Sequence, residues 1–281
     1  MTIQEAYKQL LFQLFELYDD REAANIADMV IEHVTCQPKI ERIVNKEILI
    51  SNKELTLLNS ITQELLQQKP IQYILQEAWF ANMKFFVNEH VLIPRPETEE
   101  LVELVVTEKP NAISIIDIGT GSGCISIALK KKLVNATITS IDISKKAIEV
   151  AQQNATSLNA NINLQCLDFL DENTWNVLDK YDVIVSNPPY IKHQESMSMS
   201  KHVLAFEPHL ALFVADEDAL IFYTKIAAFG KNHLTTNGKI FVEINETLGK
   251  ETLALFELQG YKATLKKDMQ EKDRMIIATL L

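Results

Sequence analysis

Short apolar runs and amphipathic stretches alternate regularly from Ala112 to the end of this 281-residue chain. The runs are rich in Ile and Val, whereas the stretches between them place apolar residues at helical spacing. Such alternation is typical of a mostly parallel sheet with helices on both faces. The expected strands are 113–118, 136–142, 162–167, 181–187, 238–244, 261–267 and 274–280, and the expected helices lie near 123–132, 144–157, 171–178, 217–233 and 246–258. The sequence therefore predicts an α/β fold with a seven-stranded sheet.

Residues 1–75 lack this alternation and predict a small all-α bundle. Ser51 and Glu54 have the spacing of a capping box and should begin its last helix, which runs to about Gln68. Helical periodicity also covers 3–18, 21–34 and 39–46. We interpret the bundle as a substrate-docking domain in preference to a structural cap.

Residues 76–93 are rich in aromatic and β-forming side chains, which predicts a linking β-hairpin that turns near Asn82. Two prolines, Pro94 and Pro96, then keep the chain extended before a helix that should start at Glu97 or Thr98. The α/β domain therefore spans 94–281. The segment 190–212 shows no strong period and is expected to be a long loop beside a site.

A glycine-rich turn follows the first expected strand, with Gly119, Gly121 and Gly123 separated by Thr120 and Ser122. Glycine permits positive φ and a close approach of the backbone to a ligand. The spacing differs from the G-x-G-x-x-G of dinucleotide-binding folds, and no Lys-Ser/Thr pair follows as in a P-loop. The turn is therefore expected to hold a ligand without a pyrophosphate.

Three acidic residues and a phenylalanine accompany this turn. Asp117 precedes the glycines, where it could accept a hydrogen bond from a ligand ammonium or orient the loop. Asp142 ends the second strand, where an acid typically accepts from ribose hydroxyls. Asp168 and Phe169 follow the third strand and would offer an adenine a hydrogen-bond partner and an apolar wall.

The tetrad Asn187-Pro188-Pro189-Tyr190 follows the fourth strand. Neither proline can continue the strand ladder, so Asn187 should stand at the carboxyl end of the sheet, where ligands bind in open α/β folds. The Asn187 side-chain carbonyl and the Pro188 backbone carbonyl could both accept from one –NH2 group, and Tyr190 adds a flat face. The tetrad resembles the signature of methyltransferases that act on amide or exocyclic amino nitrogens.

Charge and composition narrow the function further. The formal net charge of −11 lowers the expectation of a nucleic-acid substrate, because proteins that grip a phosphate backbone usually carry a basic face. The three cysteines and six histidines show no metal-ligand spacing, so no metal site is expected. Scattered cysteines, the absence of an apolar run of membrane length and the absence of a signal-peptide pattern predict a cytoplasmic protein with no membrane partner.

Taken together, the motifs resemble the HemK/PrmC family, the protein-(glutamine-N5) methyltransferases of peptide chain release factors. Besides the glycine turn and the tetrad, the resemblance rests on Lys69-Pro-Ile-Gln-Tyr-Ile74, Val91-Leu-Ile-Pro-Arg-Pro-Glu-Thr-Glu99, Phe206-Glu-Pro208 and Asp273-Arg274. It implies the class I S-adenosylmethionine-dependent methyltransferase fold. Gln76, Ala219 and Asn245 stand where glycine is usual, which is a departure that concerns loop conformation.

The resemblance also implies the substrate, which is the glutamine of the Gly-Gly-Gln motif in a release factor. Residues Gly119 to Gly123, Asp142 and Phe169, with Asn187 nearby, would bind S-adenosylmethionine. Asn187 to Tyr190 would hold the glutamine, and Asn187, Pro188 and Tyr190 would carry a direct methyl transfer.

Two other readings remain open at this point. An adenine-N6 methyltransferase of DNA or RNA would use the same tetrad on an extruded base, with Tyr190 stacked on it. The acidic charge and the lack of an extra basic domain argue against it. A catalytically silent binding module is disfavoured because the glycines and the tetrad are intact.

Overall fold

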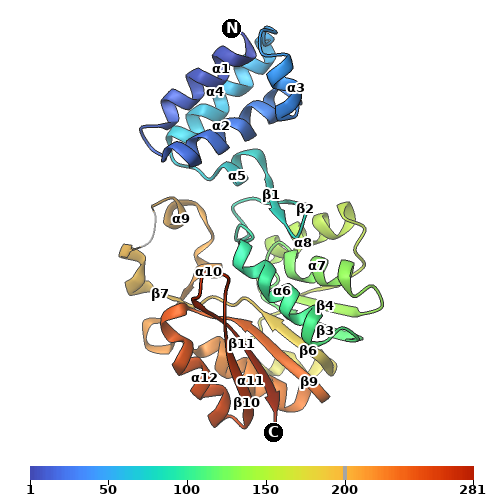
Figure 1. Cartoon of the computed structure of the whole chain (residues 1–281). Coiled ribbons are helices and arrows are strands. Elements are labelled where there is room, and N and C mark those ends of the chain that lie inside the picture. The colour runs from blue at the N-terminus through green and yellow to red at the C-terminus, as the bar shows by residue number, and fades with distance from the viewer. Residues whose placement is uncertain (199–200) are drawn as a thin grey trace. The chain divides into compact units, whose positions relative to one another are not determined.

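The computed structural model describes residues 1–198 and 201–281, and the chain forms two compact units (Figure 1). The N-terminal unit comprises 1–77 and the C-terminal unit 78–281. No helix in the described part of the chain is both long and apolar enough to cross a membrane.

The N-terminal unit is helical, as expected. Its helices are α1 (Ile3–Leu14), α2 (Asp20–Thr35), α3 (Lys39–Val44), α4 (Asn52–Leu66) and α5 (Ile71–Leu75). The predicted capping box starts α4, because Ser51 Oγ accepts from Glu54 N at 3.3 Å and Glu54 Oε2 accepts from Ser51 N at 2.6 Å. Fully buried side chains such as Leu14, Val30 and Leu65 form a core of its own.

Two details of this unit differ from the expectation. Helix α1 ends at Leu14 instead of residue 18, because Asp19 must be extended to cap α2 with its side chain. Helix α5 was not predicted, since five residues are too few to show a period. Its C-cap is Gln76, whose φ of 55° is left-handed, so this departure from glycine places a side chain in a strained conformation.

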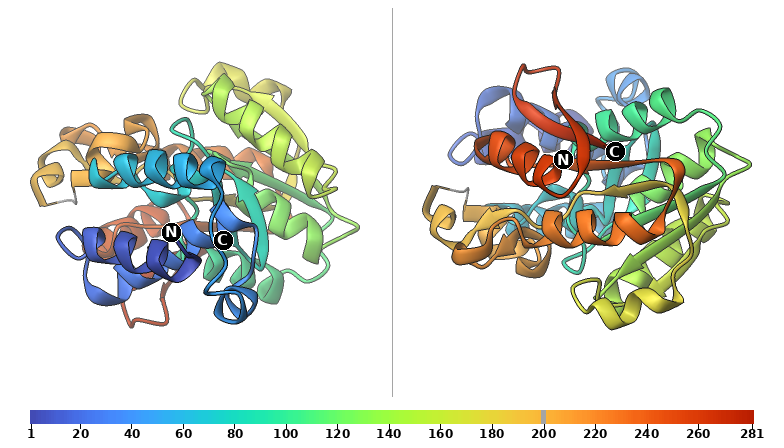
Figure 2. Two further views of the ribbon diagram at one scale, coloured as in Figure 1. Left: turned by 90° about the horizontal axis from the view of Figure 1, so that it is seen from above. Right: turned by 90° about the horizontal axis from the view of Figure 1, so that it is seen from below.

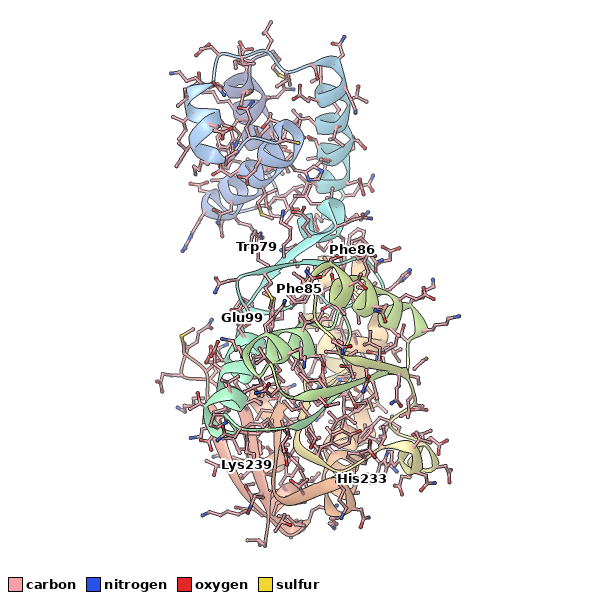
Figure 3. All side chains as sticks on the ribbon, turned by 90° about the vertical axis from the view of Figure 1, so that its right-hand side faces the viewer. Trp79, Phe85, Phe86, Glu99, His233 and Lys239 are labelled. Atoms are coloured by element: carbon pink, nitrogen blue, oxygen red, sulfur yellow. The ribbon has the colours of Figure 1, made fainter. Side chains whose placement is uncertain are left out.

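The predicted hairpin is confirmed, with strands β1 (Glu77–Phe80) and β2 (Met83–Phe86). Ala81 and Asn82 both have positive φ, 48° and 59°, as a two-residue hairpin turn requires. Phe85 is fully buried in the core of the C-terminal unit, whereas Trp79 is 63% exposed (Figure 3). The hairpin therefore packs with the C-terminal unit.

Among the described residues, the C-terminal unit forms the expected seven-stranded sheet, in the order β10-β11-β9-β6-β3-β4-β5. Strands β9, β6, β3, β4 and β5 are parallel, and β11 is antiparallel to both of its neighbours. The bounds are β3 (Ser114–Ile118), β4 (Thr137–Asp142), β5 (Asn163–Cys166), β6 (Tyr181–Ser186), β9 (Leu234–Glu243), β10 (Tyr261–Lys267) and β11 (Asp273–Leu280).

Helices cover both faces of this sheet (Figure 2). Helices α6 (Pro96–Glu108), α7 (Cys124–Lys132) and α8 (Lys145–Ser157) pack on one face, and α11 (Ile221–His233) and α12 (Gly249–Leu258) pack on the other. Along β6, Val183 and Val185 belong to the core under α6, α7 and α8, and Ile184 belongs to the core under α11 and α12. This alternation is that of a strand buried on both sides.

Several boundaries differ from the expectation. The helix expected at 171–178 is a 3-10 helix, η1 (Glu172–Val177), and β9 starts at Leu234 instead of 238. The segment expected as a loop contains short elements, namely β7 (Ile191–Lys192), η2 (His193–Ser198), α9 (Lys201–Phe206), α10 (His209–Leu212) and β8 (Phe213–Val214), with β7 and β8 paired. The 3-10 turns η3 (Asp216–Asp218) and η4 (Glu246–Leu248) follow. Elements this short show no periodicity in the sequence, and contacts with residues far away in the chain hold them in place. Residues 199 and 200 lie outside the described residues.

Candidate active site

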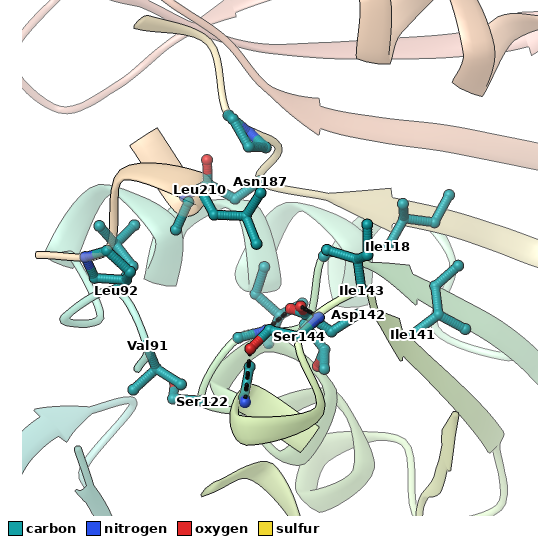
Figure 4. Close-up of a pocket in the computed structure, with 18 of the residues that line it drawn as sticks. Val91, Leu92, Ile118, Ser122, Ile141, Asp142, Ile143, Ser144, Asn187 and Leu210 are labelled. Atoms are coloured by element: carbon teal, nitrogen blue, oxygen red, sulfur yellow. Dashed lines mark hydrogen bonds between the residues drawn. The ribbon is translucent and has the colours of Figure 1, made fainter. Parts of the chain in front are cut away.

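A cavity of about 290 Å³ opens at the carboxyl ends of β3, β4 and β6 (Figure 4). Parallel strands gather loop residues at this edge, where open α/β sheets bind ligands. It brings together the following predicted site residues: Gly119, Thr120, Gly121, Ser122, Asp142, Asp168, Phe169, Asn187 and Pro189. Four other predicted residues, Asp117, Gly123, Pro188 and Tyr190, are not part of its lining.

The glycine turn presents bare backbone to the cavity. Gly119 and Gly121 have φ of 75° and 55°, and a Cβ added at either would meet no atom within 4 Å. The turn is tied to β4, since Gly119 N and Thr120 N both donate to Ile141 O. Gly123 differs, because an added Cβ would lie 3.2 Å from the Ala151 Cβ of α8. The first two glycines thus leave open space for a ligand, whereas Gly123 permits packing.

Asp117 lies beneath this turn and is fully buried. Its Oδ2 accepts from Thr120 Oγ1 at 2.7 Å and from Ser126 Oγ at 2.8 Å. No described residue donates to its other oxygen, Oδ1. Burial raises the pKa of Asp117 to about 6, with the two hydroxyl hydrogen bonds opposing the rise. Of the two roles considered for Asp117, this geometry supports orienting the loop.

Asp142 stands at the end of β4 with both oxygens toward backbone donors. Oδ2 accepts from Gly121 N at 2.9 Å, and Oδ1 accepts from Ser144 N at 2.8 Å. Each carboxylate oxygen keeps further lone-pair capacity, so Asp142 can still accept from a ligand hydroxyl. Burial raises the pKa of Asp142, and the two backbone hydrogen bonds oppose this. Ser144 caps α8 by accepting from Ala147 N at 3.2 Å.

Phe169, which lines the cavity, belongs to an aromatic cluster. Phe169 is 5% exposed and stacks on Trp175, with ring centroids 5.4 Å apart, while Phe229 meets both rings edge-on. Trp175 Nε1 donates to Phe169 O at 2.9 Å, which fixes the loop after β5. Trp175 was not singled out in the sequence, because a lone tryptophan carries no signal of its partner.

The tetrad follows β6 and places Asn187 at the cavity wall near Leu210 (Figure 4). Asn187 Nδ2 donates to Thr98 Oγ1 at 3.1 Å, and Tyr190 OH donates to Glu243 Oε1 at 3.3 Å. Glu243, at the end of β9, is 2% exposed and was missed in the sequence. Asn245, two residues on, is extended with a φ of −65° and accepts from Thr247 N, and Ala219 is right-handed with a φ of −62°, so neither position requires glycine.

A second group of lining residues, to which the sequence assigned no role, comes from the segment after the hairpin. The cavity is also lined by Glu89, His90, Val91, Leu92, Pro94 and Arg95. Arg95 Nη2 pairs with Glu207 Oε1 at 2.5 Å, and Glu207 is buried. This pair joins the Ile-Pro-Arg-Pro and Phe-Glu-Pro stretches, which were recognised as motifs but had no assigned role.

Comparison with known proteins agrees with this arrangement. Residues 97–209 match the family described as methyltransferase small domain. The chain is 41% identical to a release factor glutamine methyltransferase of Flavobacterium psychrophilum over 98% of each chain. It belongs to this family. A protein of the same name from Bacteroides thetaiotaomicron is 38% identical over 94% of this chain and 95% of that one.

The solved structure of a methyltransferase from Pyrococcus furiosus shares the fold. It is 17% identical, covers 79% of this chain and 100% of its own, and has a TM-score of 0.53. The HemK/PrmC resemblance, the class I methyltransferase fold, the methyltransferase activity and S-adenosylmethionine as cofactor are thus confirmed.

Proposed function

We propose that the chain transfers a methyl group from S-adenosylmethionine to the side-chain amide nitrogen (N5) of the Gly-Gly-Gln glutamine in peptide chain release factors, and so modulates translation termination. The observation that carries the proposal is the cavity that unites Asn187 with the glycine turn and Asp142. Its support is the full-length similarity to relatives named for this reaction. A translation factor as substrate makes the cytoplasm the expected location.

The cofactor residues follow from the chemistry of the lining. The open backbone of Gly119 to Ser122 suits the amino acid end of the cofactor, and the spare lone pairs of Asp142 suit the ribose hydroxyls. Phe169 offers its face to the adenine, with Asp168 beside it as an acceptor. When bound, the cofactor supplies an electrophilic methyl group on a sulfonium.

The reaction needs orientation more than it needs a base. An amide nitrogen is a poor nucleophile, because its lone pair is delocalised into the carbonyl. The Asn187 Oδ1 and the Pro188 carbonyl would both accept from the glutamine –NH2, which fixes the nitrogen and stabilises the positive charge that develops on it. The nitrogen bonds to the methyl carbon as the carbon–sulfur bond breaks, and one N–H proton then leaves to water. Pro189 and Tyr190 would complete the substrate pocket.

The N-terminal unit supplies a candidate docking surface for the release factor. Helix α3 and the turn after it expose five apolar side chains, which we name the α3 patch: Ile40, Ile43, Val44, Ile48 and Leu49, each between 50% and 79% exposed. Exposed apolar residues gathered in one segment often mark a protein–protein contact.

The nucleic-acid alternative has less support. Two relatives that match the chain over 94% or more of its length are named release factor glutamine methyltransferase. The net charge of −11 also opposes binding to a phosphate backbone.

A labelling experiment separates these functions. The protein is incubated with methyl-labelled S-adenosylmethionine and a release factor, the same release factor with its motif glutamine changed to alanine, or adenine-containing DNA. The proposal expects label in the first substrate alone. Label in DNA, or equal label in both release factors, would refute it.

A further inference from the structure

A buried carboxylate lies behind the tetrad and is used by none of the steps described above. Glu243 ends β9 and is 2% exposed. Its Oε2 accepts from Thr98 Oγ1 at 2.7 Å, and its Oε1 accepts from Tyr190 OH at 3.3 Å. Thr98, in the first turn of α6, is itself 3% exposed. Buried polar groups in such a chain are costly unless each is satisfied, so the bonding pattern is strongly determined.

The chain of hydrogen bonds continues from Thr98 to the substrate-facing amide. Asn187 Nδ2 lies 3.1 Å from Thr98 Oγ1, and Asn187 lines the cavity. The three side chains thus form a relay that runs from Asn187 through Thr98 to Glu243. Asn187 directly follows β6, Thr98 lies in the first turn of α6 and Glu243 ends β9.

The direction of every bond in this relay follows from the charge at its end. An ionised carboxylate has no proton, so the single hydroxyl proton of Thr98 must point toward Glu243. The Thr98 oxygen can then only accept, and Asn187 must turn its –NH2 toward it. The Asn187 carbonyl oxygen is consequently left for the cavity, where the glutamine –NH2 needs an acceptor.

A neutral Glu243 permits the opposite direction. Its carboxyl proton would point to Thr98, the Thr98 proton would point to the Asn187 carbonyl, and the Asn187 –NH2 would face the cavity. Two –NH2 groups facing one another cannot form the required bond, because both are donors.

We propose that Glu243, acting through the Thr98 hydroxyl, is a positioning residue that orients the Asn187 amide for methyl transfer. This rests on the proposed function, since it presumes a substrate –NH2 at Asn187. Glu243 itself is not among the residues that line the cavity.

The surroundings of Glu243 make its charge sensitive to pH. Burial raises the pKa of Glu243, and Glu97 of α6 adds to this. The Thr98 hydrogen bond, Arg274 of β11 and the Tyr190 hydrogen bond oppose the rise. Tyr223 of α11 donates only to the Glu243 backbone carbonyl, at 3.0 Å. Because the ionised form is the productive one, activity should fall as pH drops through the raised pKa of Glu243.

The test compares Thr98→Val, Thr98→Ser and Glu243→Gln in single-turnover methylation of a release factor. Thr98→Val keeps the side-chain shape but breaks the relay, and should slow methyl transfer by about 10- to 100-fold, as for a lost orienting contact. Thr98→Ser keeps the hydroxyl and should retain a rate within about threefold of wild type, because the relay is intact. Cofactor affinity should change by less than about threefold in both variants, since the Thr98 hydroxyl bonds to Glu243 and Asn187 and not to the glycine turn or Asp142.

Glu243→Gln removes the charge that sets the bond direction, so it should slow transfer and abolish the acid limb of the rate profile. Thr252→Val is the matched control, since Thr252 is also fully buried and its hydroxyl donates at 2.7 Å to the carbonyl of Leu248, the N-cap of α12. If Thr98→Val matched Thr252→Val in rate while the wild type methylated glutamine normally, the positioning role alone would be overturned. A wild-type protein inactive on glutamine would overturn the proposed function and this role together. Thr98→Val remains decisive even if Glu243→Gln does not fold.

Discussion

Asp117→Asn should change how the stability of the C-terminal unit depends on pH. Asp117 is fully buried, and burial raises its pKa from 3.8 to about 6. A pKa that is higher in the folded chain means that the folded form binds the proton more tightly. The stabilisation that this proton contributes to the folded chain is thus complete below pH 3.8 and is lost as pH rises to about 6. A shift of about two units corresponds to about 3 kcal/mol of unfolding free energy.

Asparagine removes the titration without removing the acceptor. Its carbonyl oxygen can take the place of Oδ2 and accept from Thr120 and Ser126. Its –NH2 would take the place of Oδ1, which accepts no hydrogen bond from the described residues. We therefore expect the unfolding free energy of the wild type to fall by about 3 kcal/mol relative to Asp117→Asn between acid and neutral pH.

Urea unfolding without cofactor measures this difference. Both tryptophans of the chain, Trp79 and Trp175, lie in the C-terminal unit, so their fluorescence reports that unit. The exposed Asp179 provides the control variant Asp179→Asn, whose stability should run parallel to that of the wild type. Parallel pH profiles for wild type and Asp117→Asn would refute the argument that Asp117 is a costly buried charge.

Three other variants test separate parts of the account. Gln76→Gly should raise the stability of the N-terminal unit by about 0.5–1 kcal/mol, because glycine relieves the strain of a left-handed φ. Gln67→Gly, at a φ of −84°, should lower that stability, and thermal unfolding measures both changes. Asp142→Ala should weaken cofactor binding by about 1–3 kcal/mol through loss of a charged acceptor, and unchanged affinity in calorimetry would remove Asp142 from the cofactor site. Ile43→Asp in the α3 patch should raise KM for an intact release factor but not for a Gly-Gly-Gln peptide. The control is Val134→Asp in the C-terminal unit, where Val134 is similarly exposed, and equal effects of Ile43→Asp on both substrates would contradict docking at the patch.

The parts of the site that the sequence predicted are those whose signal is local. Gly119 and Gly121 stand out because positive φ favours glycine, and Asp142 because an acid at a strand end has few other uses. The Asn187 tetrad is likewise recognised from four consecutive residues. The strand–helix alternation predicted the sheet because burial on both faces requires continuous apolar runs.

The parts that were missed depend on contacts between distant residues. Thr98 and Glu243 are 145 positions apart, and Arg95 and Glu207 are 112 apart, so no spacing rule joins them. The role of Asp117 stayed ambiguous because it depends on depth beneath the turn, which a sequence does not show. Short elements such as η1 were misjudged because one or two turns carry no period.

The most direct test of the central claim is single-turnover methylation of a release factor by Asn187→Ala. Asn187 supplies the side-chain acceptor for the glutamine –NH2, so its loss should lower the rate by about 10²–10³-fold, as for other preorganised polar partners. Cofactor affinity should change much less, and the exposed Asn111→Ala should behave as wild type. Asn187→Asp, which keeps an acceptor but adds a negative charge, should bind the cationic cofactor at least as tightly and still transfer slowly. Full activity in Asn187→Ala, at unchanged melting temperature, would contradict the account.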